Sequence, residues 1–356
     1  MATTWSSARP TDATPGDEQI LQKPQYVLSY NSARGGANWV SWNLNATQFG
    51  QAPRCDCFSA DLTLPAAAYH VVDFDYRNSG YDRGHMVQSE SRTTSDQENA
   101  ATFLLTNILP QAGENNQGPW SRLENHLNDL VRDSSKEVYV VAGGRYAPTP
   151  PTLKNEGRVA IPDYTWKVAV ILDRGEGLAN VASARDLRVV AVRMPNLTTA
   201  SGPASAVGIR TMPWENYATT VDSIEALTGY DLLSALPDEI EAEVEGPNSP
   251  PQVVSLRLDP AGAALTVSGK ACGGRYTACV RFAVADMNGP GDAPFTTQVD
   301  WGDNTPWLPN MVPHAGVSLL APHDYAAPGS YVVRVTATDR RGVTTSSQTI
   351  SLSVAP

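Results

Sequence analysis

A short segment rich in proline and glycine divides this chain of 356 residues into two parts of different character. Residues 246–252 read Gly-Pro-Asn-Ser-Pro-Pro-Gln, and three prolines so close together exclude a regular helix or a central strand. Before this linker, buried-strand patterns such as Trp166–Leu172 alternate with helical ones such as Val221–Leu227. We therefore expect an α+β domain at residues 25–245.

The part beyond the linker is made of short strand patterns. Apolar and polar residues alternate at 253–258, 264–268, 280–285, 296–301, 330–337 and 344–354. Such strands at hairpin spacing predict an all-β sandwich at residues 253–356. Residues 1–24 are polar, contain Pro10 and Pro15, and are expected to form a flexible arm.

The charge of the chain is unevenly distributed. The net charge is −11, and residues 247–356 contribute nothing to it because they carry seven basic and seven acidic residues. The α+β part is therefore acidic, which is unfavourable for long-range attraction of a nucleic acid. Fifteen of its 19 basic residues are arginines, whose guanidinium group can bind a phosphate through two hydrogen bonds at once. Any binding to phosphates should be local, modest and sensitive to salt.

The run Tyr81-Asp82-Arg83-Gly84-His85 places a strong cation and a titratable imidazole two positions apart. In an extended segment these two side chains face the same side and could enter one pocket. A capping pattern, Ser95 with Glu98, predicts a short helix at about 96–104.

A second polar group follows within forty residues. Asn107, Asn116 and Glu124 lie near Pro119, which suits the first turn of a helix. On that helix Trp120 and Glu124 are four residues apart and share a face. A base, a cation, oxygen ligands and a carboxylate are the groups that hydrolysis of a phosphodiester requires.

At Asp82-Arg83-Gly84-His85 the chain resembles the sugar-nonspecific DNA/RNA endonucleases, the ββα-metal (His-Me finger) group that includes mitochondrial endonuclease G. The resemblance extends over roughly residues 20–240, including Pro24–Asn31, Asn38–Trp42, Thr106-Asn107, Asn116–Glu124 and Leu227–Asp231. It implies a ββα-metal nuclease domain with a mixed central sheet. It also implies cleavage of DNA and RNA through their phosphates, with little sequence preference, leaving 5′-phosphate ends.

The same resemblance implies roles for individual residues. His85 would be the general base that deprotonates water. Asn116 would be the direct protein ligand of a hydrated Mg²⁺ or Mn²⁺, with Asn115 as its rival in register, and Glu124 would hold metal-bound water. Arg83 and Arg54 would stabilise charge on the transition state.

Two further positions bear on that assignment. Asn107 would support either the substrate or His85, although it could be only a turn residue. Where many relatives carry an arginine one helical turn after the glutamate, this chain has Asn128. Together with the acidic charge, Asn128 motivates an alternative: an inactive, nuclease-like extracellular binding or adhesion protein. A phosphodiesterase with a different substrate is the other alternative.

The cysteines and the tail indicate the compartment. Cys272 and Cys279 flank a turn and are expected to form a disulfide, whereas Cys55 and Cys57 are expected to be free thiols because a bond between them closes a very small ring. The tail resembles a polycystic-kidney-disease (PKD) domain, with markers at 299–303, 323–325 and 328–339. Such modules are typical of secreted proteins, so we expect an extracellular or periplasmic location and an extracellular ligand for this domain.

Three remaining features have alternative interpretations. The amino terminus lacks a basic and apolar leader, so either the chain is not secreted or a signal has been removed. The acidic run at 238–245 is expected to be a solvated face, with a Ca²⁺ site as the alternative. Trp39, Trp42 and Trp120 are expected in the core rather than stacked on bases. No apolar run approaches the ~18–20 residues of a membrane span.

Overall fold

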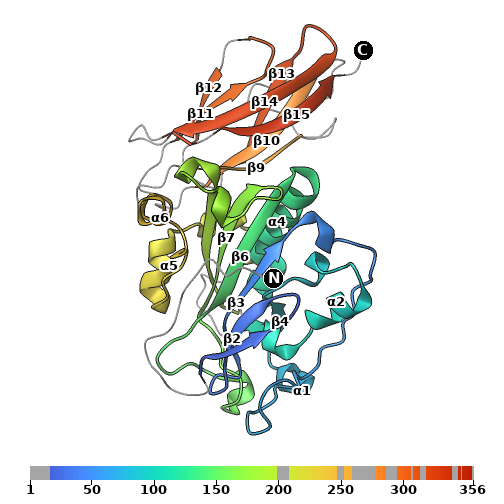
Figure 1. Cartoon of the computed structure of the whole chain (residues 1–356), viewed down its shortest axis with the longest axis vertical. Coiled ribbons are helices and arrows are strands. Elements are labelled where there is room, and N and C mark those ends of the chain that lie inside the picture. The colour runs from blue at the N-terminus through green and yellow to red at the C-terminus, as the bar shows by residue number, and fades with distance from the viewer. Residues whose placement is uncertain are drawn as a thin grey trace. The chain divides into compact units, whose positions relative to one another are not determined.

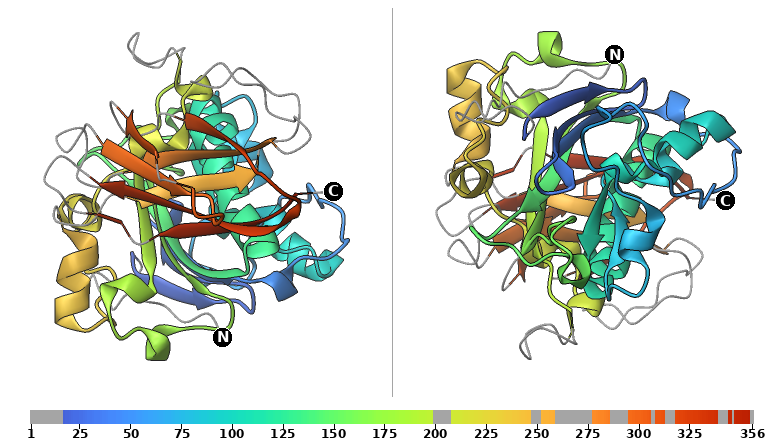
Figure 2. Two further views of the ribbon diagram at one scale, coloured as in Figure 1. Left: turned by 90° about the horizontal axis from the view of Figure 1, so that it is seen from above. Right: turned by 90° about the horizontal axis from the view of Figure 1, so that it is seen from below.

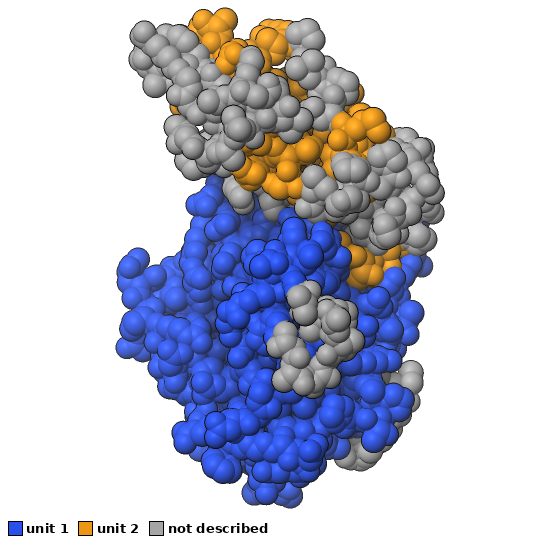
Figure 3. Space-filling view, turned by 180° about the vertical axis from the view of Figure 1, so that it is seen from behind, with its two compact units in different colours: residues 1–217, 221–245 blue, residues 218–220, 246–356 orange. Residues whose placement is uncertain are grey.

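The computed structural model describes residues 17–198, 208–246, 252–258, 277–285, 295–305, 308–312, 318–338, 344–345 and 347–354. The chain divides into two compact units, residues 1–217 with 221–245 and residues 218–220 with 246–356, which Figure 3 colours separately. The second unit therefore resumes at the first residue of the expected linker. Residues 247–251 of the linker, 1–16 of the arm, the strand pattern at 264–268, and Cys272 lie outside the described residues.

The first unit is built around a six-stranded sheet. Its strands follow in the spatial order β1 (Gln19–Gln22), β2 (Val27–Asn31), β3 (Gly36–Leu44), β6 (Lys136–Arg145), β7 (Tyr164–Asp173) and β8 (Arg188–Pro195). Every neighbouring pair is antiparallel, so the expectation of a mixed sheet was wrong. The reason is the connectivity of the chain. Strands β1, β2 and β3 follow one another as antiparallel neighbours, and so do β6, β7 and β8. The long segment between the two groups brings β6 beside β3 in the opposite direction.

Helices and a small two-stranded sheet cover the two faces of the large sheet. On one side lie α2 (Asp96–Ala101), α4 (Ser121–Asp133) and the pair β4 (Asp82–His85) and β5 (Ile108–Gln111), and on the other lie α5 (Val221–Thr228) and α6 (Asp238–Glu245) (Figures 1 and 2). Two short helices, α1 (Asp73–Tyr76) and α3 (Gly113–Asn115), complete the unit. Cover on both faces explains why β7 is buried along nearly its whole length.

Several local predictions are confirmed. Ser95 precedes α2, and its side chain accepts a hydrogen bond from the Glu98 backbone amide. Pro119 lies in an irregular turn that leads into α4. Trp120 and Trp42 belong to the core. The end of the expected arm differs: residues 19–22 form edge strand β1 because Leu21 is buried and the backbone pairs with β2.

The second unit contains two antiparallel sheets with a shared core. One has the order β13 (Ser318–Asp324), β10 (Thr277–Ala285), β9 (Gln252–Leu258), and the other β12 (Leu308–Val312), β11 (Phe295–Asp300), β14 (Gly329–Thr338), β15 (Gln348–Val354). Apolar residues of both sheets form one cluster, including Phe282 from β10 and Phe295 from β11. This is the expected all-β sandwich; β12 and β13 were not predicted as separate strands. No helix among the described residues is long and apolar enough to cross a membrane.

Candidate active site

The run that contains His85 forms β4, which pairs with β5 and lies beside α4. Gly84 is required in this strand because a Cβ atom there would collide with the Gln111 side chain of β5. Arg83 and His85 face the same side, as expected, since both contact one aromatic ring. The Arg83 guanidinium lies 4.0 Å from the centre of the Phe58 ring, and that ring is 5.4 Å from the imidazole of His85.

His85 sits in an aromatic and cationic surrounding. Its ring packs edge-on against Phe103 at 4.8 Å, the residue is only 8% exposed, and its Nε2 makes no hydrogen bond. Burial lowers the pKa of His85 to about 3, and the positive charges of Arg54 and Arg83 contribute to the shift. The imidazole is therefore neutral at ordinary pH, which is the protonation state that a base needs.

Two neighbours hold the backbone at His85 and just after it. Trp120 at the start of α4 donates from Nε1 to the His85 carbonyl at 3.3 Å. The fully buried Asn107 binds Val87 in both directions, donating to its carbonyl and accepting from its amide, each at 3.0 Å. Because both ends of the Asn107 amide are committed to main-chain groups, its geometry favours the support of His85 over contact with a substrate.

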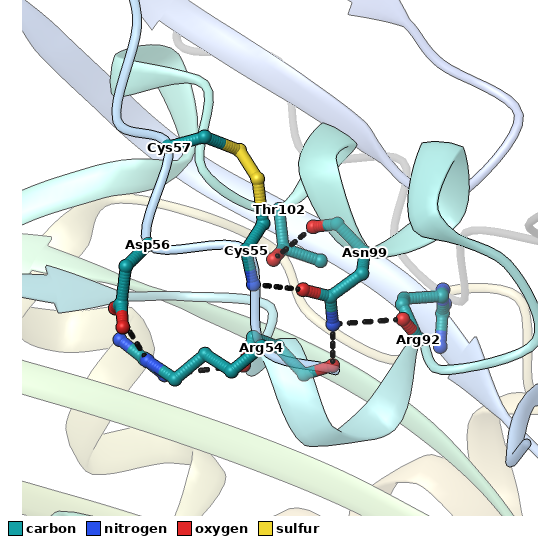
Figure 4. The surroundings of a disulfide bond; sticks show 8 residues. Arg54, Cys55, Asp56, Cys57, Arg92, Asn99 and Thr102 are labelled. Carbon is teal, nitrogen blue, oxygen red and sulfur yellow. Dashed lines mark hydrogen bonds and ion pairs between the residues drawn. A yellow bond between two sulfur atoms is a disulfide. The ribbon is translucent and has the colours of Figure 1, made fainter. Parts of the chain in front are cut away.

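Arg54 lies in a loop that is closed by a disulfide between Cys55 and Cys57 (Figure 4). The expectation of two free thiols was wrong. Asp56 between them has a left-handed backbone (φ 48°), and this turn brings the two Cα atoms to 5.1 Å, an ordinary disulfide separation. The buried Asn99 anchors the loop by accepting from the Cys55 amide at 2.9 Å.

The Arg54 side chain is held on the same loop. Its Nε donates to Asp56 at 2.7 Å and its Nη1 to Ser89 at 3.1 Å, while the guanidinium lies 5.0 Å from the Phe103 ring. Phe103 thus contacts both Arg54 and His85. The loop therefore places this cation beside the imidazole.

Replacing Cys55 and Cys57 together with serine is expected to lower kcat/KM for the phosphodiester substrate that the resemblance implies, because Arg54 loses the closed turn that positions it. The loss should be roughly ten-fold, since displacements near 1 Å cost up to a hundred-fold. Thermal stability should change little because the loop closed by the bond is very short. Initial cleavage rates and a melting curve measure both. Unchanged kinetics would mean that the disulfide does not position Arg54.

A pocket of about 540 Å³ opens beside these residues. Arg54, Arg83 and Asn116, three of the predicted site residues, line it, together with Phe58, Tyr81, Asp82 and others. Arg83 is paired with Asp73, which also binds Arg77. His85, Asn107 and Glu124 are not lining residues: His85 and Asn107 are buried, and the side chain of Glu124 is 11% exposed.

Asn116 and its register rival Asn115 differ in surroundings. The Nδ2 of Asn116 donates to Asp82 at 2.9 Å, and the residue faces the pocket. Asn115 is fully buried and donates instead to Thr165 on β7 at 2.8 Å. The geometry favours Asn116 as the residue that meets a ligand.

Glu124 pairs with a lysine that the sequence analysis did not single out. Lys167 Nζ lies 3.3 Å from the Glu124 carboxylate and 4.0 Å from the Trp120 ring centre, and its side chain is 1% exposed. Burial raises the pKa of Glu124, and Lys167 opposes that rise. Trp120 and Glu124 thus share a helix face, as predicted, and that face meets Lys167. One lysine inside the apolar run Trp166–Leu172 was the signal that could have revealed this contact.

Asn128, the departure from the family pattern, is a buried structural residue here. It donates to Gln88 at 2.9 Å and accepts from Ser91 at 3.0 Å. It therefore carries no charge toward the site.

Comparisons with known proteins place this geometry among the nucleases. The model of the DNA/RNA non-specific endonuclease family matches residues 6–239. A nuclease of Nostoc sp. is 42% identical over 241 residues, which cover 67% of this chain and 82% of that protein. Human mitochondrial endonuclease G is 28% identical over 225 residues, 60% of this chain and 69% of that protein. The solved structure of an EndoG/EndoGI complex is similar with a TM-score of 0.52 and 25% identity, covering 64% of this chain and 90% of that one.

Proposed function

This chain belongs to the DNA/RNA non-specific endonuclease family, and we propose that it cuts DNA and RNA as a metal-dependent nuclease without sequence preference. The observation that carries the proposal is the juxtaposition of a neutral, buried imidazole, that of His85, with a pocket lined by Arg54, Arg83 and Asn116. Two guanidinium groups and an amide recognise a phosphate rather than a base edge, which accounts for indifference to sequence and sugar.

The proposed reaction is attack of water on the scissile phosphorus. His85 accepts a proton from the water, and Arg54 and Arg83 stabilise the negative charge that grows on the phosphate oxygens. Before substrate binds, the ion pair with Asp73 holds Arg83 in place. The phosphate of the substrate then replaces Asp73 as the partner of this arginine. The bond between phosphorus and the 3′-oxygen breaks, and the leaving oxygen takes a proton from solvent, so the products would carry 5′-phosphate and 3′-hydroxyl ends.

The residues present fit a hydrated Mg²⁺ or Mn²⁺. Because the Nδ2 of Asn116 is held by Asp82, its Oδ1 is the amide atom left for a cation. Amide and carboxylate oxygens are hard donors, and Mg²⁺ needs few protein ligands because it keeps several waters. Asn116 would hold the ion directly and Glu124 through water. When bound, the cation would neutralise charge on the phosphate oxygens.

Asn116→Ala is expected to raise the metal concentration for half-maximal activity by at least about ten-fold, since loss of even an outer partner of a metal usually costs that much. The matched control is Gln117→Ala, because Gln117 binds the same Asp82 oxygen at 2.8 Å and is the next residue. Titrating Mg²⁺ and Mn²⁺ against initial rates makes the measurement. An unchanged requirement in Asn116→Ala would remove this residue from the metal site.

The function itself is tested on supercoiled plasmid and on RNA, with Mg²⁺ or Mn²⁺ against EDTA. Cleavage of both substrates that EDTA abolishes is the expected result. An inert protein would favour the alternative hypothesis, an inactive nuclease-like binding or adhesion protein. Hydrolysis of a small aryl phosphodiester without nucleic-acid cleavage would favour another phosphodiesterase.

The location and the second unit are part of the proposal. We propose a secreted or periplasmic enzyme whose β-sandwich is PKD-like and binds an extracellular ligand. Support comes from Cys279, which takes part in a disulfide, although the expected pairing with Cys272 stays a prediction. Two of the expected markers also meet: the imidazole of His323 stacks on Trp301 at 4.8 Å and binds Asp303 at 2.7 Å.

A further inference from the structure

Three carboxylates converge between the last two helices of the first unit. Asp222 and Glu225 stand three residues apart on α5, and Glu245 is the last residue of α6. One oxygen from each carboxylate lies within 4.8 Å of the other two. These helices cover the face of the large sheet opposite to β4 and α4, so the cluster is separate from the candidate active site (Figures 1 and 2).

Glu245 is the unexpected member of this cluster. The acidic run at 238–245 was expected to be a solvated face, but Glu245 is only 6% exposed. Its Oε1 is buried and makes no hydrogen bond, and the same holds for the Oε1 of Glu241 on the same helix. A buried carboxylate oxygen without a partner is costly unless a proton or a cation compensates it.

The surrounding charges make the need for compensation stronger. Burial raises the pKa of Glu245 to about 9, and the charged groups that add to the shift are four further carboxylates, those of Glu225, Glu241, Asp222 and Asp231. Burial raises the pKa of Glu225 to about 7; a hydrogen bond from the Leu232 amide to its Oε1 opposes the rise, and its acidic neighbours add to it. The cluster as it stands therefore repels its own charge.

We propose that Asp222, Glu225 and Glu245 bind a calcium-type divalent cation that clamps α6 onto α5. Oxygens bound to one Ca²⁺ at about 2.3–2.6 Å lie at most roughly 5 Å apart, whereas those bound to Mg²⁺ at about 2.0–2.1 Å lie at most roughly 4 Å apart. The three oxygens lie within 4.8 Å of one another, so a small closing movement brings them onto one ion, and the flexible coordination of Ca²⁺ accepts such a site more readily than the strict octahedron of Mg²⁺. Asp222 is exposed, so water can complete the coordination. A cation held by the Glu245 carboxylate would offset the cost of its unpartnered Oε1.

The test uses the full chain carrying Asn116→Ala, which removes the proposed catalytic metal ligand, after treatment with EDTA. Saturating Ca²⁺ should raise Tm by about 5 °C or more, and Mg²⁺ at equal concentration should raise it less. Calorimetric titration with Ca²⁺ should show a binding event that Glu245→Gln removes. Glu239→Gln is the matched control, because Glu239 is an exposed residue of the same helix outside the cluster.

The sign of the effect in EDTA separates this proposal from a merely structural role. Without Ca²⁺, Glu245→Gln should melt at the same temperature as its parent or higher, because glutamine is neutral without taking up a proton among the neighbouring carboxylates. If Glu245→Gln does not fold, Asp222→Asn on the exposed side of the cluster serves instead and should weaken Ca²⁺ binding at least ten-fold. The proposal is overturned if Ca²⁺ leaves the Tm unchanged, or if both variants keep the full response. The first result would mean that Glu245 holds a proton rather than sharing a cation, and the second that Ca²⁺ binds elsewhere on the chain.

Discussion

His85→Ala is expected to lower the rate of phosphodiester cleavage by roughly 10²–10⁴-fold on both DNA and RNA, which is what a positioned general base contributes. The imidazole of His85 is buried against the rings of Phe103 and Phe58. Arg54 lies over the first ring and Arg83 over the second. Alanine removes the proton acceptor but leaves both cations and Asn116 in the pocket. Binding of a nucleic acid should therefore persist, and the loss should fall on kcat rather than on KM.

The pH dependence provides a second readout for His85. Because burial and two arginines lower its pKa to about 3, the imidazole stays neutral far below the ordinary value of 6.5. Any loss of wild-type activity between pH 5 and pH 7 should therefore come from another group. In the unfolded chain the imidazole binds a proton more readily, so His85 should destabilise the fold progressively as pH falls from about 6.5 toward 3.

Initial rates on plasmid and RNA, with binding measured separately, test this prediction. His70→Ala is the control, since His70 belongs to the same unit and its imidazole contacts the carbonyl of Pro65. His70→Ala should keep wild-type rates. Retention of activity by His85→Ala would leave the family assignment standing but would remove His85 from the mechanism.

Regular patterns in the sequence predicted the parts of the fold that depend on local physics. The alternation in β2 and β3, the cap at Ser95 and the helix after Pro119 each follow from side-chain period or backbone chemistry. The mixed sheet was expected from the family resemblance rather than from a pattern. Strand direction depends on which distant segments pair, and a single sequence does not encode that locally.

The candidate site was predictable where a motif carried it and not where packing decided it. Arg83 and His85 share a face because they are two apart in a strand. The Cys55–Cys57 bond depends on one left-handed residue, Asp56, which composition does not reveal. Glu245 reads as part of a solvated acidic run, and only the packing of α6 makes it buried.

Lys167→Met is expected to destabilise the protein by roughly 3–5 kcal/mol at pH 8, because it leaves the carboxylate of Glu124 buried without its cation. Lys167 is almost wholly buried, lies against Trp120, and reaches Glu124 at 3.3 Å. Methionine keeps most of the volume of lysine and its contact with the indole, so lost charge rather than lost packing dominates. Activity should fall as well, since Glu124 is the proposed holder of metal-bound water.

The dependence on pH distinguishes the electrostatic cause from a packing defect. Without Lys167 the pKa of Glu124 rises further, and a carboxyl whose folded pKa is raised loses stability as pH rises through that value. The destabilisation should therefore be largest at pH 8 and shrink at pH 5, where Glu124 takes up a proton. Urea unfolding at several pH values measures it. The acid limb of the activity profile should move to higher pH for the same reason.

The matched control is Lys136→Met on the neighbouring strand β6. Lys136 pairs with Asp173 at the surface, and an exposed pair of this kind is worth about 0–1 kcal/mol. Combining Lys167→Met with Glu124→Gln removes both charges, so the double variant should regain stability over either single one but remain inactive. A destabilisation by Lys167→Met that is constant from pH 5 to pH 8, and that Glu124→Gln does not relieve, would show that the lysine only fills space. In that case the charge of Glu124 would not depend on Lys167.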